Sequence, residues 1–191
     1  MRITGGALRG RRLVPWEHAE IRPVRDLVRS ALFSILVEFV PDARVLDLFC
    51  GTGVVGIEAL SRGAMECVFV DISEEACDIV RRNLDAFGMI DRGVVLAADY
   101  AHGIARLEAR ARVFDLLFVG APYHRGLAEA ALGELGRGSL LGNDPVAVTE
   151  VGRDEELSET FGVLTCVDRR NYGDSALWFF RPRQLSEKTD R

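Results

Sequence analysis

From residue 44 onward, short apolar runs alternate with longer segments in which apolar residues recur every three or four positions. The runs predict strands and the longer segments predict amphipathic helices. The expected strands cover residues 44–49, 67–71, 93–97 and 114–119, and the expected helices cover 53–62, 74–87, 100–110 and 125–136. Strand–helix alternation with short connections indicates a mostly parallel sheet with helices on both faces.

The N-terminal segment, residues 1–41, departs from this alternation and is expected to be an extension of the main domain. Residues 2–4 and 11–14 predict a small β-hairpin across a glycine-rich turn. Apolar residues between Val24 and Val40 recur at helical spacing, so a single helix is expected there. Pro41 would end it.

The C-terminal segment departs from the alternation as well. A further strand is expected at residues 145–151, and residues 161–167 and 176–180 predict an antiparallel hairpin. Residues from 183 onward are polar and are expected to form a disordered tail. At 191 residues, the chain therefore predicts one α/β domain that ends near residue 182.

A glycine pattern follows the first expected strand and opens the first helix of the alternating region. Gly51, Gly53 and Gly56 form Gly-x-Gly-x-x-Gly, which lets a ligand approach the backbone and the helix N–H groups. Asp71 lies twenty residues after Gly51, where a carboxylate can accept hydrogen bonds from both ribose hydroxyls. Dehydrogenases that bind NAD share both features, so the pattern alone leaves the nucleotide cofactor open.

Two further carboxylates favour a different cofactor. Asp47 lies inside the first strand, where a cofactor with a charged amino-acid end benefits from a nearby carboxylate. Asp99 ends the third strand and could accept a hydrogen bond from an adenine amino group. Helix N-capping is the alternative role for Asp71 and Asp99, although Ser73 is the better cap after Asp71. The candidate cofactor-binding residues are Asp47, Phe49, Gly51, Gly53, Asp71, Ile72, Asp99 and Tyr100.

These strand-end carboxylates and the terminal hairpin resemble the Rossmann-like fold of class I S-adenosylmethionine-dependent methyltransferases. In members that methylate amino groups, the fourth strand ends in Asp- or Asn-Pro-Pro-Tyr or -Phe, which holds the amino group and stacks on an extruded base. This chain has the candidate catalytic residues Gly120, Ala121, Pro122 and Tyr123 at that place. The proline and the ring remain, but the side-chain acceptor is missing, and a plain strand-ending turn is the alternative.

Segments on both flanks resemble one family, the RsmD-type 16S rRNA guanine-N2 methyltransferases. The matching segments are Ile3–Leu13, Arg22–Phe33, Leu46–Gly53, Gly56–Ala64 and Tyr172–Leu177. The resemblance implies methyl transfer from S-adenosylmethionine to the N2 amino group of a guanine in 16S rRNA, free or within the small ribosomal subunit. The resemblance and the small single domain favour a monomer. The first residues lack the apolar core of a signal peptide, so a cytoplasmic location is expected. No metal is expected, since the methyl donor is already activated.

The charge distribution is compatible with an RNA partner. The chain carries a net charge of −5, yet residues 1–30 hold seven arginines against three acidic residues. Such a basic segment on an acidic body indicates either a phosphate-binding patch or a solvated basic terminus. The candidate RNA-binding residues are Arg9, Arg11, Arg12, Arg22, Arg25 and Arg29.

Two other hypotheses remain besides an active methyltransferase. One is a catalytically impaired relative that binds S-adenosylmethionine and RNA, because Gly120 and Ala121 replace Asp-Pro. The other is an NAD-dependent oxidoreductase, which is disfavoured because no proton-transfer residue stands out. No apolar run approaches the length of a membrane span. The spacing of Cys50, Cys67, Cys77 and Cys166 favours buried reduced thiols over a zinc site or disulfides.

Overall fold

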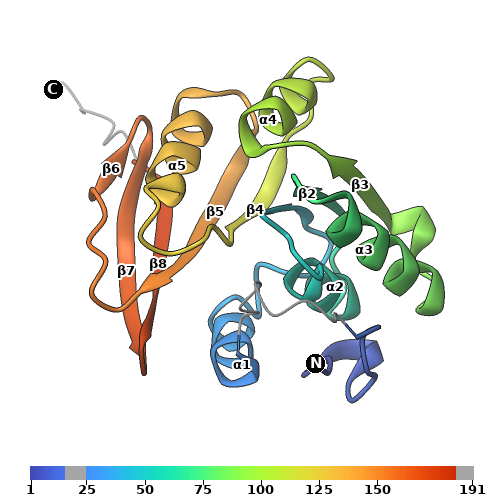
Figure 1. Cartoon of the computed structure of the whole chain (residues 1–191). Coiled ribbons are helices and arrows are strands. Elements are labelled where there is room, and N and C mark those ends of the chain that lie inside the picture. Colours follow the sequence, from blue (N-terminus) through green and yellow to red (C-terminus); the bar gives the residue numbers. More distant parts are fainter. Residues whose placement is uncertain (16–24, 184–191) are drawn as a thin grey trace, which may run out of the picture.

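A computed structural model describes residues 1–15 and 25–183, which form a central sheet with helices on both faces (Figure 1). The strands are β1 (Arg44–Leu48), β2 (Glu66–Asp71), β3 (Gly93–Ala97), β4 (Phe114–Val119), β5 (Leu141–Gly152), β6 (Thr160–Phe161), β7 (Leu164–Tyr172) and β8 (Ser175–Pro182). Their order is β3-β2-β1-β4-β5-β8-β7-β6. The first five strands in this order, from β3 to β5, are parallel to one another. Strand β8 is antiparallel to both of its neighbours, β5 and β7.

The helices follow the strands as the alternation predicts. They are α1 (Asp26–Ile35), α2 (Val54–Ser61), α3 (Glu74–Ala86), α4 (Tyr100–Glu108) and α5 (Leu127–Arg137). The predicted α/β fold, with its parallel core and antiparallel C-terminal hairpin, is confirmed. The crossovers place α2 and α3 on one face and α4 and α5 on the other, so both faces of the parallel part of the sheet are buried.

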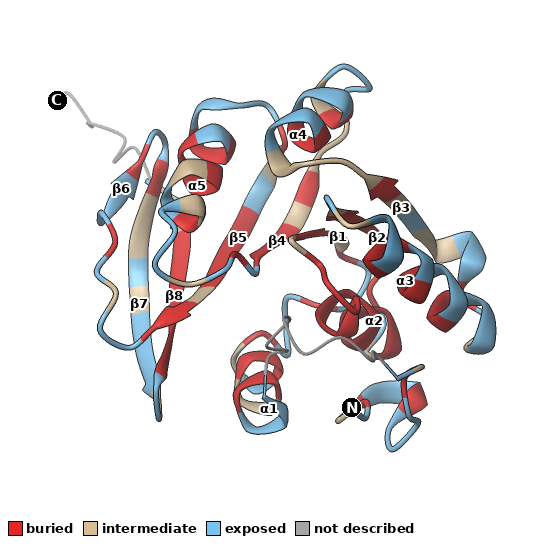
Figure 2. Ribbon diagram, in the orientation of Figure 1, coloured by how far each residue is buried: buried red, intermediate tan, exposed pale blue. Residues whose placement is uncertain are grey.

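Two apolar clusters fill the space between the layers. Figure 2 shows buried residues along the strands and on the helices that pack against them. On one face, α1, α2 and α3 pack on the sheet through residues such as Phe33, Ile57 and Val80. On the other face, α4 and α5 pack through residues such as Ile104 and Leu132. The parallel strands are apolar on both sides, which is why they read as continuous hydrophobic runs in the sequence.

The first predicted helix is shorter than its apolar spacing suggested. Instead of running to Val40, α1 ends at Ile35, and residues 36–40 form a hydrogen-bonded turn. The amides of Phe39 and Val40 both donate to the carbonyl of Leu36 there. Leu36 and Val40 are both buried. The turn therefore keeps the apolar residues in the core, which is why spacing alone could not separate it from helix.

The C-terminal hairpin is longer than predicted. The polar run 169–172, expected to be a loop, belongs to β7, and the connection consists of Gly173 and Asp174 alone. Gly173 has a φ of 64°, as two-residue hairpin turns require. Strand β7 is antiparallel and mostly exposed along this polar run, so one side of it faces solvent and accepts polar residues. Strand β5 likewise begins at Leu141 rather than at 145.

The predicted N-terminal hairpin is present in minimal form. Arg2 and Arg12 form an isolated antiparallel bridge, and the amide of Ile3 donates to the carbonyl of Arg11 at 3.0 Å. The buried carboxylate of Glu58 on α2 accepts the amide of Thr4 at 2.8 Å and thereby docks the hairpin. At the other end, the amide of Arg183 donates to the carbonyl of Val163, while the rest of the predicted tail lies outside the described residues.

Candidate functional site

The loop between β1 and α2 is built from residues with left-handed backbone. Phe49, Gly51 and Gly53 have φ values of 58°, 51° and 71°, and Gly53 is the N-cap of α2. The third glycine serves packing, because a Cβ on Gly56 would lie 2.3 Å from the Phe69 ring of β2. Gly51 and Gly53 therefore lie in the loop, whereas Gly56 lies at the contact between helix and strand.

Asp47 is a buried carboxylate at the floor of this loop. It is 3% exposed, and its Oδ2 accepts the amide of Gly56 at 2.9 Å. Burial raises the pKa of Asp47 to about 8, and the nearby Asp71 adds to the shift although the Gly56 hydrogen bond opposes it. A cation placed beside Asp47 would favour its charged form.

Asp71 ends β2 beside the same loop. Its Oδ2 accepts the amide of Gly51 at 2.8 Å and its Oδ1 accepts the amide of Ser73 at 2.9 Å. The N-cap of α3 is Ser73, as the sequence predicts, so capping does not account for Asp71. Ile72 follows with 75% of its surface exposed, which leaves an apolar side chain open to a ligand.

Asp99 caps α4, which was the alternative role for this residue. Its carboxylate accepts the amide of His102 at 3.0 Å and contacts the His102 ring at 2.6 Å. These hydrogen bonds lower the pKa of Asp99 below its ordinary value. Tyr100, the next residue, stacks obliquely on Phe49 with ring centroids 5.4 Å apart. Contact of Asp99 and Tyr100 with a cofactor stays a prediction.

A cleft of about 90 Å³, partly open to solvent, lies at the carboxyl ends of the central strands. Ligands of open α/β sheets bind at this edge. The cleft is lined by Leu32, Asp47, Phe49, Cys50, Gly51, Thr52, Val54, Val55, Phe118, Val119, Gly120, Val148, Glu150 and Leu177. The structure thus brings Asp47, Phe49 and Gly51 together with Gly120, the first of the predicted catalytic residues.

The segment after β4 borders this cleft. The amide of Gly120 donates to the carbonyl of Leu48 on β1 at 3.0 Å, which fixes the end of the strand. Ala121 is buried, Pro122 is exposed and Tyr123 is half-buried. The Tyr123 ring makes an edge contact with His124, whose own φ is 57°. Gly120 does not have a positive φ, so its backbone conformation does not require glycine. A Cβ there would make van der Waals contacts with two backbone carbonyl oxygens and meet no side chain.

The predicted RNA-binding arginines divide into exposed and buried residues. Arg9, Arg11 and Arg12 are exposed on the N-terminal hairpin. Arg25 is exposed at the start of α1, where it forms an ion pair with Asp174 of the β7–β8 turn. Arg22 lies outside the described residues.

Arg29 is a correction to the predicted set. Its side chain is fully buried, with an ion pair to Glu58 at 3.2 Å and another to Asp26 at 3.0 Å. Burial favours the neutral form of Glu58, but hydrogen bonds from Thr4 and the charges of Arg62 and Arg29 outweigh it and lower its pKa. Arg29 therefore holds α1, α2 and the hairpin together and is excluded from phosphate contact.

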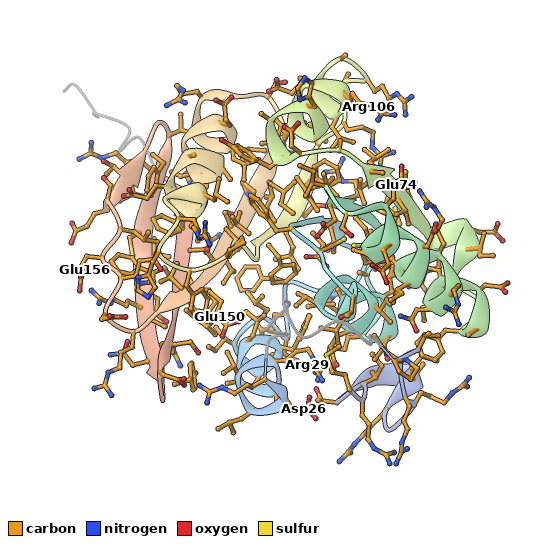
Figure 3. The ribbon with its side chains drawn as sticks, in the orientation of Figure 1. Asp26, Arg29, Glu74, Arg106, Glu150 and Glu156 are labelled. Atoms are coloured by element: carbon orange, nitrogen blue, oxygen red, sulfur yellow. The ribbon has the colours of Figure 1, made fainter. Side chains whose placement is uncertain are left out.

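Sequence reasoning missed Glu150. It lies on β5 and lines the cleft together with Gly120. Figure 3 labels its side chain. The available signal was a carboxylate directly after the run 145–149, within the strand expected at residues 145–151. The sequence does not show that β5 neighbours β4, and that neighbourhood is what places Glu150 in the site.

Comparisons with known proteins agree with this geometry. A family model described as "Conserved hypothetical protein 95" matches residues 1–181. The chain belongs to this family. It is 31% identical over 183 residues to YlbH of Bacillus subtilis, which covers 96% of this chain and all of the relative. It is 30% identical over 150 residues to ribosomal RNA small subunit methyltransferase D of Escherichia coli, which covers 78% of this chain and 74% of that protein.

A solved structure agrees as well. The Escherichia coli protein yhhF, titled as a methyltransferase candidate, superimposes with a TM-score of 0.83 at 26% identity, over 96% of this chain and 98% of the other. The predicted membership of the RsmD-type family is confirmed, as is the class I methyltransferase fold. The protein is an S-adenosylmethionine-dependent methyltransferase of this family, and neither alternative is favoured.

The remaining expectations concern other classes of site. No helix in the described part of the chain is long and apolar enough to cross a membrane. Within residues 1–15 and 25–183, no group of three or more metal-ligating side chains is present. All four cysteines are free, and three are buried, whereas Cys166 is half-buried. The monomeric state and the cytoplasmic location stay predictions.

Proposed function

We propose that this methyltransferase modifies the N2 amino group of a guanine in 16S ribosomal RNA. The observation that carries the proposal is the joining of the Asp47–Gly51 loop and Gly120 in one cleft at the ends of β1 and β4. Methyl donor and amino acceptor must meet in such a cleft. Relatives named for the small-subunit RNA support this choice of substrate.

The loop residues fit S-adenosylmethionine. The buried carboxylate of Asp47 suits the ammonium group of the amino-acid end, and the left-handed backbone at Gly51 and Gly53 leaves room for close approach. Asp71 uses one acceptor site on each oxygen for Gly51 and Ser73, and a carboxylate has about four such sites in all. It can therefore still bind both ribose hydroxyls. The exposed Ile72 offers an apolar contact for the adenine ring.

Tyr123 and the backbone of Ala121 are assigned to the target base. A half-buried aromatic ring three residues after Gly120 can stack on an extruded guanine, as in other enzymes that act on nucleobases. The cofactor supplies a methyl group bound to a sulfonium sulfur. When the methyl group is transferred, the sulfur leaves as a neutral thioether, which is a good leaving group. Arg9, Arg11, Arg12 and Arg25 provide exposed positive charge for the phosphate backbone.

The test is methylation of small ribosomal subunits that lack the modification, prepared from Escherichia coli deleted for its own methyltransferase D. Purified protein and labelled S-adenosylmethionine are added to subunits or to free 16S rRNA. Nuclease digestion and mass spectrometry should then reveal N2-methylguanosine. Absence of that nucleoside from both substrates, with cofactor binding intact by calorimetry, would refute the proposed substrate.

A further inference from the structure

Glu150 lies next to Gly120 although thirty residues separate them in the sequence. Strands β4 and β5 are parallel neighbours, and their register pairs Val119 with Thr149. Gly120 and Glu150 each follow this last pair, so they occupy matching positions just beyond the paired part of the two strands. Neighbouring strands lie about 4.8 Å apart, a distance that a glutamate side chain can span.

The side chain of Glu150 belongs to the cleft face of the sheet. Side chains alternate along a strand, and Val148, two residues earlier, lines the cleft as well. On the other side, Glu150 pairs in register with Leu177 of β8, which also lines the cleft. Gly120 and Phe118 occupy the same face of β4.

The carboxylate of Glu150 makes no hydrogen bond or ion pair with any other described residue. Its neighbours in the cleft wall are apolar, among them Val148 and Leu177. Other half-buried or buried carboxylates in this protein have partners: Asp115 binds Arg44, and Glu58 binds Thr4 and Arg62. A carboxylate that lies in an apolar wall without a partner lowers the stability of the fold. Its presence in the cleft therefore indicates that it binds a ligand.

Gly120 leaves the space that such a ligand needs. A Cβ built there would meet only two backbone carbonyl oxygens, that of Phe49 at 3.4 Å and that of Leu48 at 3.6 Å. No side chain fills the position where amino-group methyltransferases carry Asp or Asn. The polar acceptor is therefore absent from β4, while an unused one stands at the matching place on β5.

We infer that Glu150 is the carboxylate that binds the target amino group, in place of the acceptor missing at Gly120. The inference rests on the proposed guanine substrate, whose amino group and adjacent ring N–H are both donors. In the transfer, the N2 lone pair forms a bond to the methyl carbon and the carbon–sulfur bond breaks with its electron pair on sulfur. N2 then carries one proton too many. Glu150 accepts that proton and releases it to water.

The experiment compares wild-type protein, Glu150→Gln and the double variant Gly120→Asp/Glu150→Gln on small subunits. Glutamine keeps the shape but removes the charge and the proton acceptor. We expect Glu150→Gln to lower kcat about 10²–10³-fold, the usual cost of one preorganised polar partner. Its Kd for S-adenosylmethionine by calorimetry should stay unchanged. The double variant restores a carboxylate from β4 and should recover at least ten-fold of the loss.

Glu159→Gln is the matched control, because Glu159 is exposed and outside the cleft. It should retain wild-type kcat.

The outcomes separate the two claims. Wild-type protein that binds cofactor but methylates neither substrate would refute the proposed function. Active wild type with an equally active Glu150→Gln would overturn the role of Glu150 and leave the proposed function intact. Loss of cofactor binding in Glu150→Gln would also overturn it, because it would assign the carboxylate to the cofactor.

Discussion

Gly56→Ala tests whether close packing of α2 on β2 shapes the cofactor site. The added Cβ would lie 2.3 Å from Cε1 of Phe69 and 2.6 Å from Sγ of Cys67, and both side chains are fully buried. Carbon atoms in contact need about 3.5–4.0 Å, so α2 or the Phe69 ring must move by roughly an ångström. Overpacking of this kind costs about 1–3 kcal/mol.

The intrinsic helix preference of alanine over glycine offsets about 1 kcal/mol of that cost. A net loss of up to about 2 kcal/mol in the free energy of unfolding is expected, with Tm falling by about 2–4 °C for each kcal/mol. The shift also moves the Gly56 amide that donates to Asp47 at 2.9 Å. Weakening one hydrogen bond of about 1 kcal/mol should reduce cofactor affinity roughly five-fold.

Urea unfolding measures the stability and calorimetry with S-adenosylmethionine measures the affinity. Gly133→Ala is the matched control, since Gly133 lies inside α5 and its added Cβ would meet only the flexible guanidinium of Arg137 at 3.4 Å. That variant should be as stable as wild type or more stable, by up to about 1 kcal/mol. Wild-type stability and cofactor affinity in Gly56→Ala would refute the packing argument.

Three further predictions concern charge. Because the pKa of Asp47 is raised to about 8 in the folded state, folding takes up a proton between about pH 4 and pH 8, and wild-type stability should fall as pH rises through that window. Asp47→Asn should flatten this dependence in urea titrations at pH 5 and pH 8; equal slopes would contradict the raised pKa. Glu58→Gln should lower the free energy of unfolding by about 3–5 kcal/mol, because it leaves Arg29 buried without its partner on α2; a loss below 1 kcal/mol by denaturant unfolding would speak against this network. Replacing Arg9, Arg11 and Arg12 by alanine should weaken RNA binding and reduce its salt slope by up to about 2–3, as measured by fluorescence anisotropy; an unchanged slope would remove the hairpin from the RNA interface.

The sequence predicted most of the fold because its signals are local. Apolar runs of strand length, glycines at the start of α2 and the capping residue Ser73 report backbone preferences that act within a few residues. Boundaries were wrong where two local structures satisfy the same pattern. The turn after α1 buries Leu36 and Val40 as a longer helix would, and the exposed side of β7 carries a polar run that is typical of loops.

In the candidate site as well, some residues are placed by local structure and others by contacts between distant segments. Asp47, Gly51 and Gly53 lie within one strand–turn–helix unit, so their mutual position follows from that unit alone, and the structure places Asp47 and Gly51 in the cleft as expected. The roles of Arg29 and Glu150 depend on segments that are distant in the chain. Arg29 is buried because Glu58 and the hairpin close over it.

The sequence by itself determined the alternating α/β order, the cofactor loop and the family, and it exposed the missing acceptor at Gly120. Tertiary structure alone decided which charges face solvent and which strand lies beside β4. The physical reason is that charge burial and strand order arise from packing between remote segments, which no local backbone preference encodes. The register between β4 and β5 thus places the unpartnered carboxylate of Glu150 beside the position that Gly120 leaves empty.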